Sequence, residues 1–231
     1  MIEDGRKCFD YVAELLSPSG EYKAAAGYWY INDEDGDDDG DEVENSEMLV
    51  VWNDSGIVYS VKGYDNIDPD DARLFDDGRL FHWDGDETVT FFAADGKRTK
   101  KKLSVSYMGN GIEKDFAWFY GEGGENLDLK IQVFVFETMK SWTKKLRQDT
   151  DLDAVFPSPT DGGVVVAVRT YDKVLIVSKY SIHGEKQTCP PSDLRIAAGK
   201  RSADAAPPPS AGKVAGAFFK GVMSQLGKKR K

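Results

Sequence analysis

The sequence lacks any apolar run close to the ~20 residues that a membrane-spanning helix needs. Its 231 residues include only two cysteines and two histidines. Met1 is followed by the charged segment IEDGRK, which is unlike a secretory signal peptide. We therefore expect a soluble, intracellular protein in which Cys8 and Cys189 are free thiols in a reducing compartment, in preference to a single disulfide.

The sequence also lacks the short motifs of common enzymes. It contains no nucleophile elbow, phosphate-binding loop, HExxH or CxxC motif. Of the two histidines, His82 and His183, the first falls in a strand-like segment, where we expect a strand-face residue in preference to a base or metal ligand. The many carboxylates fall in turn-like segments, which favours solvated turn caps over an acid and base pair. We predict a protein that is not an enzyme and that needs no cofactor or metal.

Positive charge is scarce outside the C-terminal end. The net charge is −10, but the residues from Arg195 onward carry +8, so the rest of the chain carries −18. An acidic body of this kind disfavours direct nucleic-acid binding and favours basic protein partners. The basic end is expected to have a separate role.

Short apolar segments alternate with tight-turn signals through the first half of the chain. Residues 48–52 and 57–61 flank Asn53-Asp54-Ser55-Gly56, which is typical of a hairpin turn. Further strands are expected at 28–31, 79–83, 88–93, 103–108, 115–120, 164–168 and 174–177. Sequential strands with tight turns usually pair with their neighbours, so the pattern predicts an antiparallel meander.

The pattern changes period within residues 129–148. Leu129, Ile131, Val133 and Val135 alternate as in a strand, whereas the apolar residues at 139, 142 and 146 have helical spacing. A first short helix is also predicted over residues 9–16. We therefore predict a mainly β fold, in which an antiparallel β-meander closes as a barrel or sandwich with one capping amphipathic helix. The predicted domain covers residues 1–190.

A run of antiparallel strands closed by one amphipathic helix resembles the pleckstrin-homology-like superfold. The likeness rests on residues 130–147, as last strand and helix, together with the strands of 48–120. It implies a binding domain without naming the partner. The hairpin at 164–177 lies outside this pattern, and its pairing with residues 129–136 would exclude the simple pleckstrin-homology arrangement.

An acidic segment at residues 33–47 contains ten acids in fifteen residues and is predicted to be a solvated loop. Its first half has the D-x-D-x-D-G opening of a calcium loop, but Ser46 occupies the position of the bidentate glutamate. A flexible polyanion that attracts basic proteins is favoured over a calcium site, and a merely solubilising loop explains the segment at least as well. The predicted partner-binding residues here are Asp35, Asp37, Asp38, Asp39 and Asp41.

A basic run follows the Asp95-Gly96 turn. It comprises Lys97, Arg98, Lys100, Lys101 and Lys102. Such a cluster could bind anionic lipid at ~1 kcal/mol per charge. A solvated hairpin, or contact with the acidic loop of the same chain, is favoured over a lipid site.

The C-terminal end changes composition twice. Residues 191–212 are rich in Pro and Ala and are predicted to be a disordered linker. Residues 213–231 form a basic amphipathic tail whose predicted partner-binding residues are Phe218, Phe219, Val222 and Leu226. The chain ends in a cluster that fits a nuclear import signal, made of Lys228, Lys229, Arg230 and Lys231.

These features predict a non-enzymatic protein-interaction module, nuclear in preference to cytoplasmic. Its acidic body and helical basic tail would dock partners, including basic proteins such as histones, in a histone-chaperone-like role. The alternative is a peripheral membrane adaptor that binds anionic lipid through the basic run and the tail. The sequence leaves the oligomeric state open.

Overall fold

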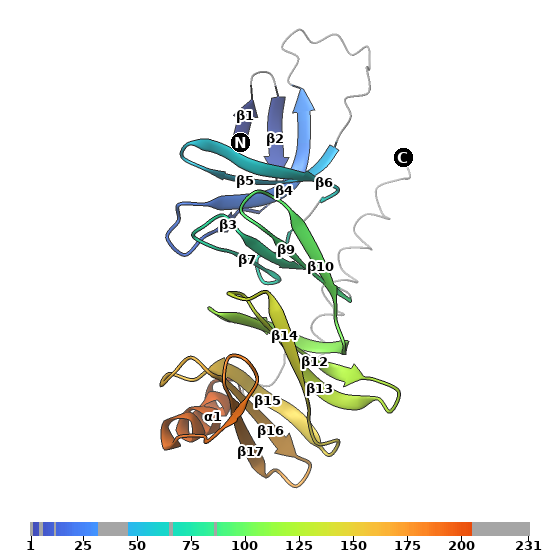
Figure 1. Cartoon of the computed structure of the whole chain (residues 1–231), viewed down its shortest axis with the longest axis vertical. Helices are drawn as coiled ribbons and strands as arrows, with labels where there is room; N and C mark the ends of the chain where they lie inside the picture. The colour runs from blue at the N-terminus through green and yellow to red at the C-terminus, as the bar shows by residue number, and fades with distance from the viewer. Residues whose placement is uncertain are drawn as a thin grey trace, which may run out of the picture.

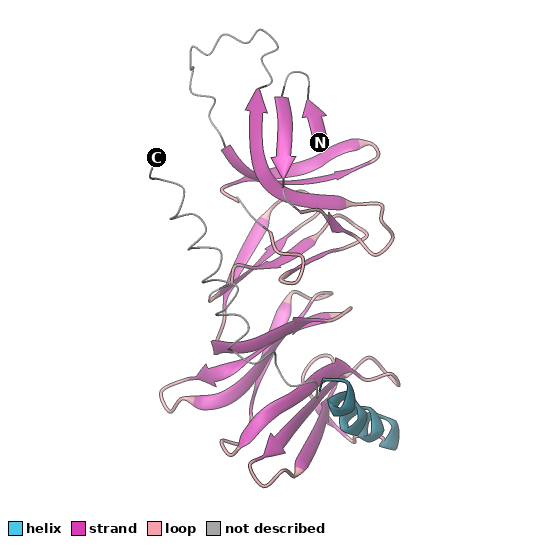
Figure 2. Cartoon of the chain, turned by 180° about the vertical axis from the view of Figure 1, so that it is seen from behind, coloured by secondary structure: helices cyan, strands magenta, loops and turns pink. Residues whose placement is uncertain are grey.

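The computed structural model describes residues 2–4, 7–11, 13–31, 46–64, 67–85 and 87–204. Strands dominate these residues, and the single helix lies near the end of the described chain (Figure 2). The strands form four antiparallel sheets, which we name A to D in chain order. The mainly β prediction is therefore confirmed.

Sheet A has six strands and sheets B to D have four each. Sheet A contains β1 (Ile2–Asp4), β2 (Lys7–Tyr11), β3 (Leu15–Leu16), β4 (Lys23–Ile31), β5 (Ser46–Asn53) and β6 (Gly56–Lys62). Sheet B contains β7 (Ala72–Leu74), β8 (Leu80–Trp83), β9 (Thr88–Phe92) and β10 (Arg98–Lys102). Sheet C contains β11 (Ser106–Ile112), β12 (Phe116–Gly123), β13 (Asp128–Val135) and β14 (Lys140–Lys145). Sheet D contains β15 (Thr150–Pro157), β16 (Val164–Thr170), β17 (Leu175–Tyr180) and β18 (Lys186–Gln187).

Each of sheets B, C and D is a simple meander in which consecutive strands pair. The chain leaves a sheet from its last strand and enters the next sheet at that sheet's first strand, as from β10 to β11 and from β14 to β15. Each of these sheets therefore has one edge formed by its first strand and one formed by its last strand. The predicted meander is confirmed, but it is divided among separate sheets.

The sheets stack face to face along the long axis of the molecule, from sheet A to sheet D (Figure 1). A separate apolar cluster joins each pair of neighbours. Leu49 of sheet A packs with Phe92 of sheet B, Phe81 of sheet B with Phe134 of sheet C, and Ile131 of sheet C with Val166 of sheet D. The internal sheets B and C bury residues on both faces, which accounts for continuous apolar segments such as residues 133–136.

The stack is open at its two ends, because no apolar cluster of the described residues joins sheet A to sheet D. Consecutive four-stranded meanders packed in this way are also the building plan of β-propellers, which close into a ring. The helix α1 (Pro191–Asp204) covers the outer face of sheet D, with Ala197 buried against Phe156 and Val165. The fold is thus a sandwich of several sheets with a helix on one end.

The helix predicted after residue 139 is wrong. Thr138 and Met139 form a turn, with Met139 at a φ of 52°, and residues 140–145 return as strand β14 beside β13. The indole of Trp142 packs 5.4 Å from the Tyr180 ring and donates from Nε1 to the Ile182 carbonyl oxygen at 2.9 Å. A turn followed by alternation produces the same three-then-four spacing as a helix. The described residues thus lack the helix on which the pleckstrin-homology resemblance relied.

The first predicted helix is also wrong, because residues 9–11 belong to strand β2 and residues 15–16 form strand β3 of sheet A. Phe9 and Tyr11 alternate onto one face, with their rings stacked 5.6 Å apart. The predicted linker begins as the helix α1 instead. Pro191 occupies its first position, where proline is favoured, and Asp193 lies in its first turn. The remainder of the predicted linker, from residue 205, lies outside the described residues.

The remaining strand predictions are largely confirmed. The hairpin around Asn53-Asp54-Ser55-Gly56 is β5 and β6, and the strand at 129–136 is β13. Residues 164–168 lie in β16 and residues 175–177 lie in β17. β16 pairs with β15 and with β17, in a sheet separate from that of β13. The strand expected at 103–108 instead begins at Ser106, since β10 takes up the basic run.

Candidate functional site

Most of the residues predicted to bind a partner lie outside the described residues. They are the acidic residues Asp35, Asp37, Asp38, Asp39 and Asp41, the apolar tail residues Phe218, Phe219, Val222 and Leu226, and the terminal cluster Lys228, Lys229, Arg230 and Lys231. The calcium-like segment lies outside them as well. The described residues contain no group of three or more His, Cys, Asp or Glu side chains that could hold a metal ion.

The basic run does not form one patch. Except for Lys97 in the preceding turn, it forms β10, in which successive side chains point to opposite faces. Lys101 donates to the Met139 carbonyl oxygen of sheet C, and Lys102 pairs with Glu87 at 2.5 Å. Arg98 and Lys100 line a pocket on the face toward sheet A. The alternation of side chains along β10 thus places residues that are consecutive in the sequence on opposite faces of sheet B.

The last-strand edges of sheets B and C are rich in lysine. β10 reads RTKKK and β14 reads KSWTKK. Lysines on an edge strand discourage another strand from pairing there, because pairing would bring their charges together and desolvate them. The basic run therefore has a structural explanation at the edge of sheet B.

The first-strand edge of sheet C has the opposite character. β11 reads SYMGNGI and contains no charged residue, and its Tyr107 and Met108 side chains are 51% and 57% exposed. β11 pairs only with β12 among the described strands, so one row of its backbone N–H and C=O groups is open. An uncharged edge with exposed apolar side chains is the type of edge that accepts an added strand.

Contacts with sheet B fix the position of β11. The Asn110 side chain donates to Asp71 Oδ1 at 3.1 Å, and the Tyr107 ring lies 4.7 Å from that of Trp83. Burial raises the pKa of Asp71, against the opposing effect of the Asn110 hydrogen bond. Met108 is the extra residue of a β-bulge opposite β12, so its side chain is exposed at an irregularity in the pairing.

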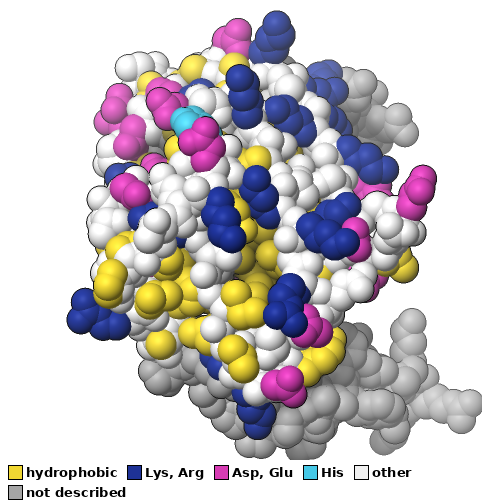
Figure 3. Space-filling model, turned by 60° about the horizontal axis from the view of Figure 1, so that its bottom comes forward, with side chains coloured by type: hydrophobic (Ala, Val, Ile, Leu, Met, Phe, Trp, Pro, Cys, Tyr) yellow, Lys and Arg dark blue, Asp and Glu magenta, His cyan; other side chains and the backbone are white. Residues whose placement is uncertain are grey.

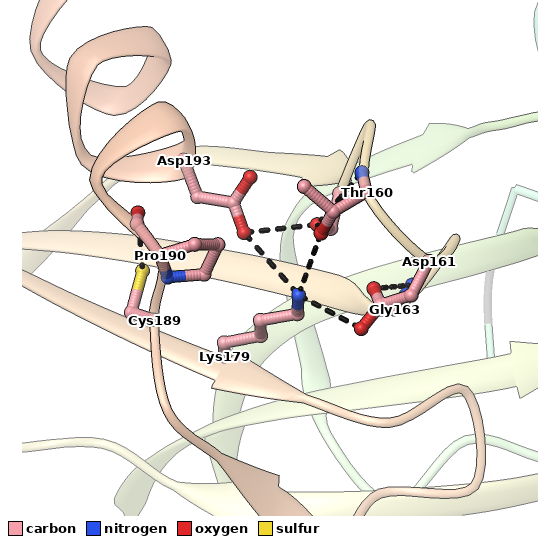
Figure 4. Close-up of polar contacts among 8 residues, drawn as sticks. Thr160, Asp161, Gly163, Lys179, Cys189, Pro190 and Asp193 are labelled. Carbon is pink, nitrogen blue, oxygen red and sulfur yellow. Dashed lines mark hydrogen bonds and ion pairs between the residues drawn. The ribbon is translucent and has the colours of Figure 1, made fainter.

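A buried charge cluster fixes α1 to sheet D (Figure 4). The Lys179 ammonium, with a side chain only 4% exposed, lies 2.9 Å from Asp161 and 3.5 Å from Asp193, and it donates to Thr160 Oγ1 at 3.1 Å. Asp193 is completely buried, and its Oδ2 accepts a hydrogen bond from Ser158 at 2.9 Å. These contacts hold the helix against the sheet through Asp193 Oδ2, while the buried Asp193 Oδ1 has no hydrogen-bond partner among the described residues.

The balance of these contacts keeps Lys179 charged. Burial works to lower the pKa of Lys179, but the hydrogen bond and charge of Asp161, together with Asp193, raise it overall. The same contact with Lys179, helped by the Gly163 N–H, lowers the pKa of Asp161. Cys189, beside the cluster, is a free thiol whose pKa is raised by burial. A thiol in this state is a poor nucleophile.

The sheet D end of the molecule exposes apolar side chains with lysines and arginines around them (Figure 3). The large exposed apolar residues of sheet D and α1 are Tyr171, Val174 and Leu194. They come from one turn and from the outward side of the helix, and they do not form an edge strand. Among the described residues, no helix is long and apolar enough to cross a membrane.

Sequence reasoning predicted a strand at 103–108, which overlaps β11, but it did not identify β11 as a candidate binding edge. The only signal in the sequence was the absence of charged residues from residues 106–112, in contrast to the lysine-rich edge strands β10 and β14. Its meaning depends on the sheet order, because only an edge strand has open backbone groups.

No family model matches this chain, and no curated protein matches it. One similar solved structure is titled "Crystal structure of the eukaryotic initiation factor", with a TM-score of 0.41 and 13% sequence identity. The similarity covers 77% of this chain and 44% of that chain, so this chain spans less than half of that structure.

Proposed function

We propose that this chain is a non-enzymatic protein-interaction module that binds an extended segment of a partner along the open edge of β11. The observation that carries the proposal is the contrast between β11, uncharged and exposed at Tyr107 and Met108, and the lysine-rich edges β10 and β14. A partner strand would pair with the open backbone of β11.

The occupant that fits this edge is an extended segment with apolar side chains at alternate positions. Alternate side chains of an added strand fall on one face, where they would contact Tyr107 and Met108. The stacked sheets supply a rigid support, because Asn110 and Tyr107 are tied to sheet B. A preorganised edge loses little conformational entropy when the partner binds.

The negative charge of this chain sets a second requirement for the proposed partner. Residues before Arg195 carry a net charge of −18, which favours a partner with basic residues beside its apolar ones. Histones are one class of such partners, and nuclear import through the terminal basic cluster is compatible with it. This part of the proposal predicts that binding weakens steeply as salt concentration rises.

The proposal is tested with two matched substitutions. Met108→Lys places a charge on the β11 edge, whereas Ile57→Lys places one at a 42% exposed apolar position of β6, the last strand of sheet A. A partner that co-purifies with the unaltered chain is first identified. Its affinity for each variant and for the unaltered chain is then measured by calorimetry. We expect Met108→Lys to weaken binding at least tenfold and Ile57→Lys to leave it unchanged. Equal affinity of Met108→Lys and the unaltered chain would contradict docking at β11.

A further inference from the structure

A pocket of about 480 Å³ in sheet B borders the β11 edge of sheet C. Two of its lining residues contact β11 directly. Asp71 accepts a hydrogen bond from the Asn110 side chain at 3.1 Å, and the Trp83 ring lies 4.7 Å from that of Tyr107. A strand docked on β11 would therefore pass beside this pocket.

The pairing of β11 with β12 sets the direction in which the Asn110 side chain points. Asn110 lies opposite Phe119, which belongs to the apolar cluster between sheets B and C. Residues that lie opposite each other in an antiparallel pair place their side chains on the same face. A residue of an added strand opposite Asn110 would therefore also point toward sheet B, where Asp71 lies.

The end of the pocket next to β11 is acidic. Asp68 and Asp71 belong to one turn, in which the Asp71 N–H donates to the Asp68 carbonyl oxygen at 3.0 Å. Burial raises the pKa of Asp71, and the charges of Asp68 and Asp70 raise it further, against the opposing effect of the Asn110 hydrogen bond. The three carboxylates repel one another, so a bound cation would relieve an existing repulsion.

This end of the pocket has unused hydrogen-bond acceptors. Asp68 Oδ1 accepts from the Asp70 N–H at 2.9 Å and Asp71 Oδ1 accepts from Asn110, but the second oxygen of each carboxylate has no hydrogen-bond partner among the described residues. His82 lines the same pocket, is only 8% exposed, and has no partner for Nδ1 in that part of the chain. Burial lowers the pKa of His82, so the ring is neutral and keeps one acceptor nitrogen.

The two cations of the lining belong to the opposite side of sheet B. Lys100 shares a row with His82 and Ala72 across four strands, so three strand spacings of about 4.8 Å, or about 14 Å in all, separate the Lys100 and Ala72 backbones. Arg98 lies in the next row, farther along the sheet from Asp71. Salt screens exposed charges over about 8–10 Å. The acidic end is therefore not neutralised by these two side chains.

We propose that the acidic end of this pocket binds the charged group of a lysine or arginine side chain that projects from the strand docked on β11. The inference rests on the proposed function and specifies the partner, which would carry a basic residue opposite Asn110. An ammonium or guanidinium group has only hydrogen-bond donors, and these match the unused oxygens of Asp68 and Asp71. The rings of Tyr64 and Trp83 in the lining provide an apolar surface for the methylene stem of such a side chain.

The pocket is tested first without any partner strand. The full chain is titrated with butylguanidinium chloride at constant ionic strength, while NMR follows the ring signals of the two histidines. His82 lines the pocket, whereas His183 lies exposed in the turn between β17 and β18 and is the internal control. We expect saturable shifts of the His82 signals alone. Absent shifts, or shifts of both histidines that do not saturate, would overturn the pocket as a cation site.

Matched charge variants separate this pocket from general attraction to an acidic surface. Asp68→Asn with Asp71→Asn is compared with Asp54→Asn with Asp95→Asn, which removes the same charge from exposed turns elsewhere. Asparagine keeps an oxygen that can accept the hydrogen bonds made by Asp68 and Asp71, so the fold is retained. We expect the first pair to weaken butylguanidinium binding at least about tenfold and the second pair to leave it unchanged. Equal losses in the two pairs would overturn the site.

Two peptides then test whether the basic side chain arrives on a docked strand. One alternates valine and threonine around a central arginine, and the other carries citrulline, which has a similar shape but no charge, in place of the arginine. We expect the arginine peptide to bind at least about tenfold more tightly than the citrulline peptide. Asp68→Asn with Asp71→Asn should remove this difference without weakening the citrulline peptide.

The two proposals fail in different ways. Met108→Lys should weaken both peptides and leave butylguanidinium binding unchanged, because it alters only the β11 edge. Butylguanidinium binding without peptide binding would overturn docking at β11, and with it the docked side chain. Peptide binding with equal affinity for arginine and citrulline would overturn the pocket and leave docking at β11 intact.

Discussion

Lys179 and Asp193, two buried side chains of opposite charge, lie 3.5 Å apart at the contact between sheet D and α1. The pair comes from β17 and from the first turn of the helix, and Ser158 donates to the same carboxylate oxygen. The helix buries few apolar residues beyond Ile196 and Ala197. Its attachment therefore depends strongly on this charge pair.

Replacing Asp193 by Ala is expected to destabilise the fold by about 3–5 kcal/mol, because it leaves Lys179 buried with only Asp161 as a charged partner. Urea unfolding followed by tryptophan fluorescence measures the change. Arg147→Gln, which breaks the exposed pair with Asp149, is the control and is expected to leave the urea midpoint unchanged. Equal midpoints for Asp193→Ala and the unaltered chain would refute a structural role for the pair.

His82 makes stability depend on pH. Burial lowers the pKa of His82, with Asp84 acting in the opposite direction, so the folded state holds the imidazole neutral. Between the folded pKa and the unfolded value of about 6.5, the unfolded chain binds a proton that the folded chain does not. Stability should therefore fall as pH is lowered below about 6.5.

Urea midpoints at pH 7.5 and 5.5 test this effect in three chains. We expect a drop in the unaltered chain, a smaller drop in His82→Phe, and an undiminished drop in His183→Gln, since His183 is exposed. If His82→Phe loses as much stability as the unaltered chain, another group carries the pH dependence. The carboxyls of Asp149 and Asp161 have lowered pKa values and act at more acidic pH than this window.

The contact between sheets B and C should be sensitive to truncation of its buried side chains. Phe134 of sheet C is completely buried there, and its ring centroid lies 6.2 Å from that of Phe91 of sheet B. Phe134→Ala is expected to cost about 3–5 kcal/mol, measured as the free energy of unfolding. Val174→Ala, at a position 57% exposed, is the comparison and should change little. A cost below about 1 kcal/mol for Phe134→Ala would show that the two sheets are not packed as described.

Local pattern predicted most strands of this chain but not their grouping. The hairpin at Asn53 and Gly56 and the apolar residues 164–168 carried clear turn and strand signals. Met139, Trp142 and Leu146 were misassigned because helical spacing also arises from a turn followed by an alternating strand. The division into four sheets depends on packing between faces, which no short segment encodes.

The candidate sites could not be predicted from the sequence, because they too depend on how the strands are grouped and packed. Arg98 and Lys100 belonged to the predicted basic run, but their separation from Lys101 follows from strand alternation and sheet order. His82 lines the same pocket as Arg98 and Lys100, and this proximity follows from the pairing register of β8, β9 and β10. The helix α1 was missed because its burial is small and its main anchor, Asp193, is polar.

The most direct test of the proposed function is hydrogen–deuterium exchange of the chain with and without its partner. Docking at β11 predicts that amides of residues 106–112 exchange more slowly in the complex, because open backbone groups become paired with the partner strand. The amides of β10 and β14 should exchange at unchanged rates. Slowed exchange at β10 or β14, with β11 unaffected, would contradict the account.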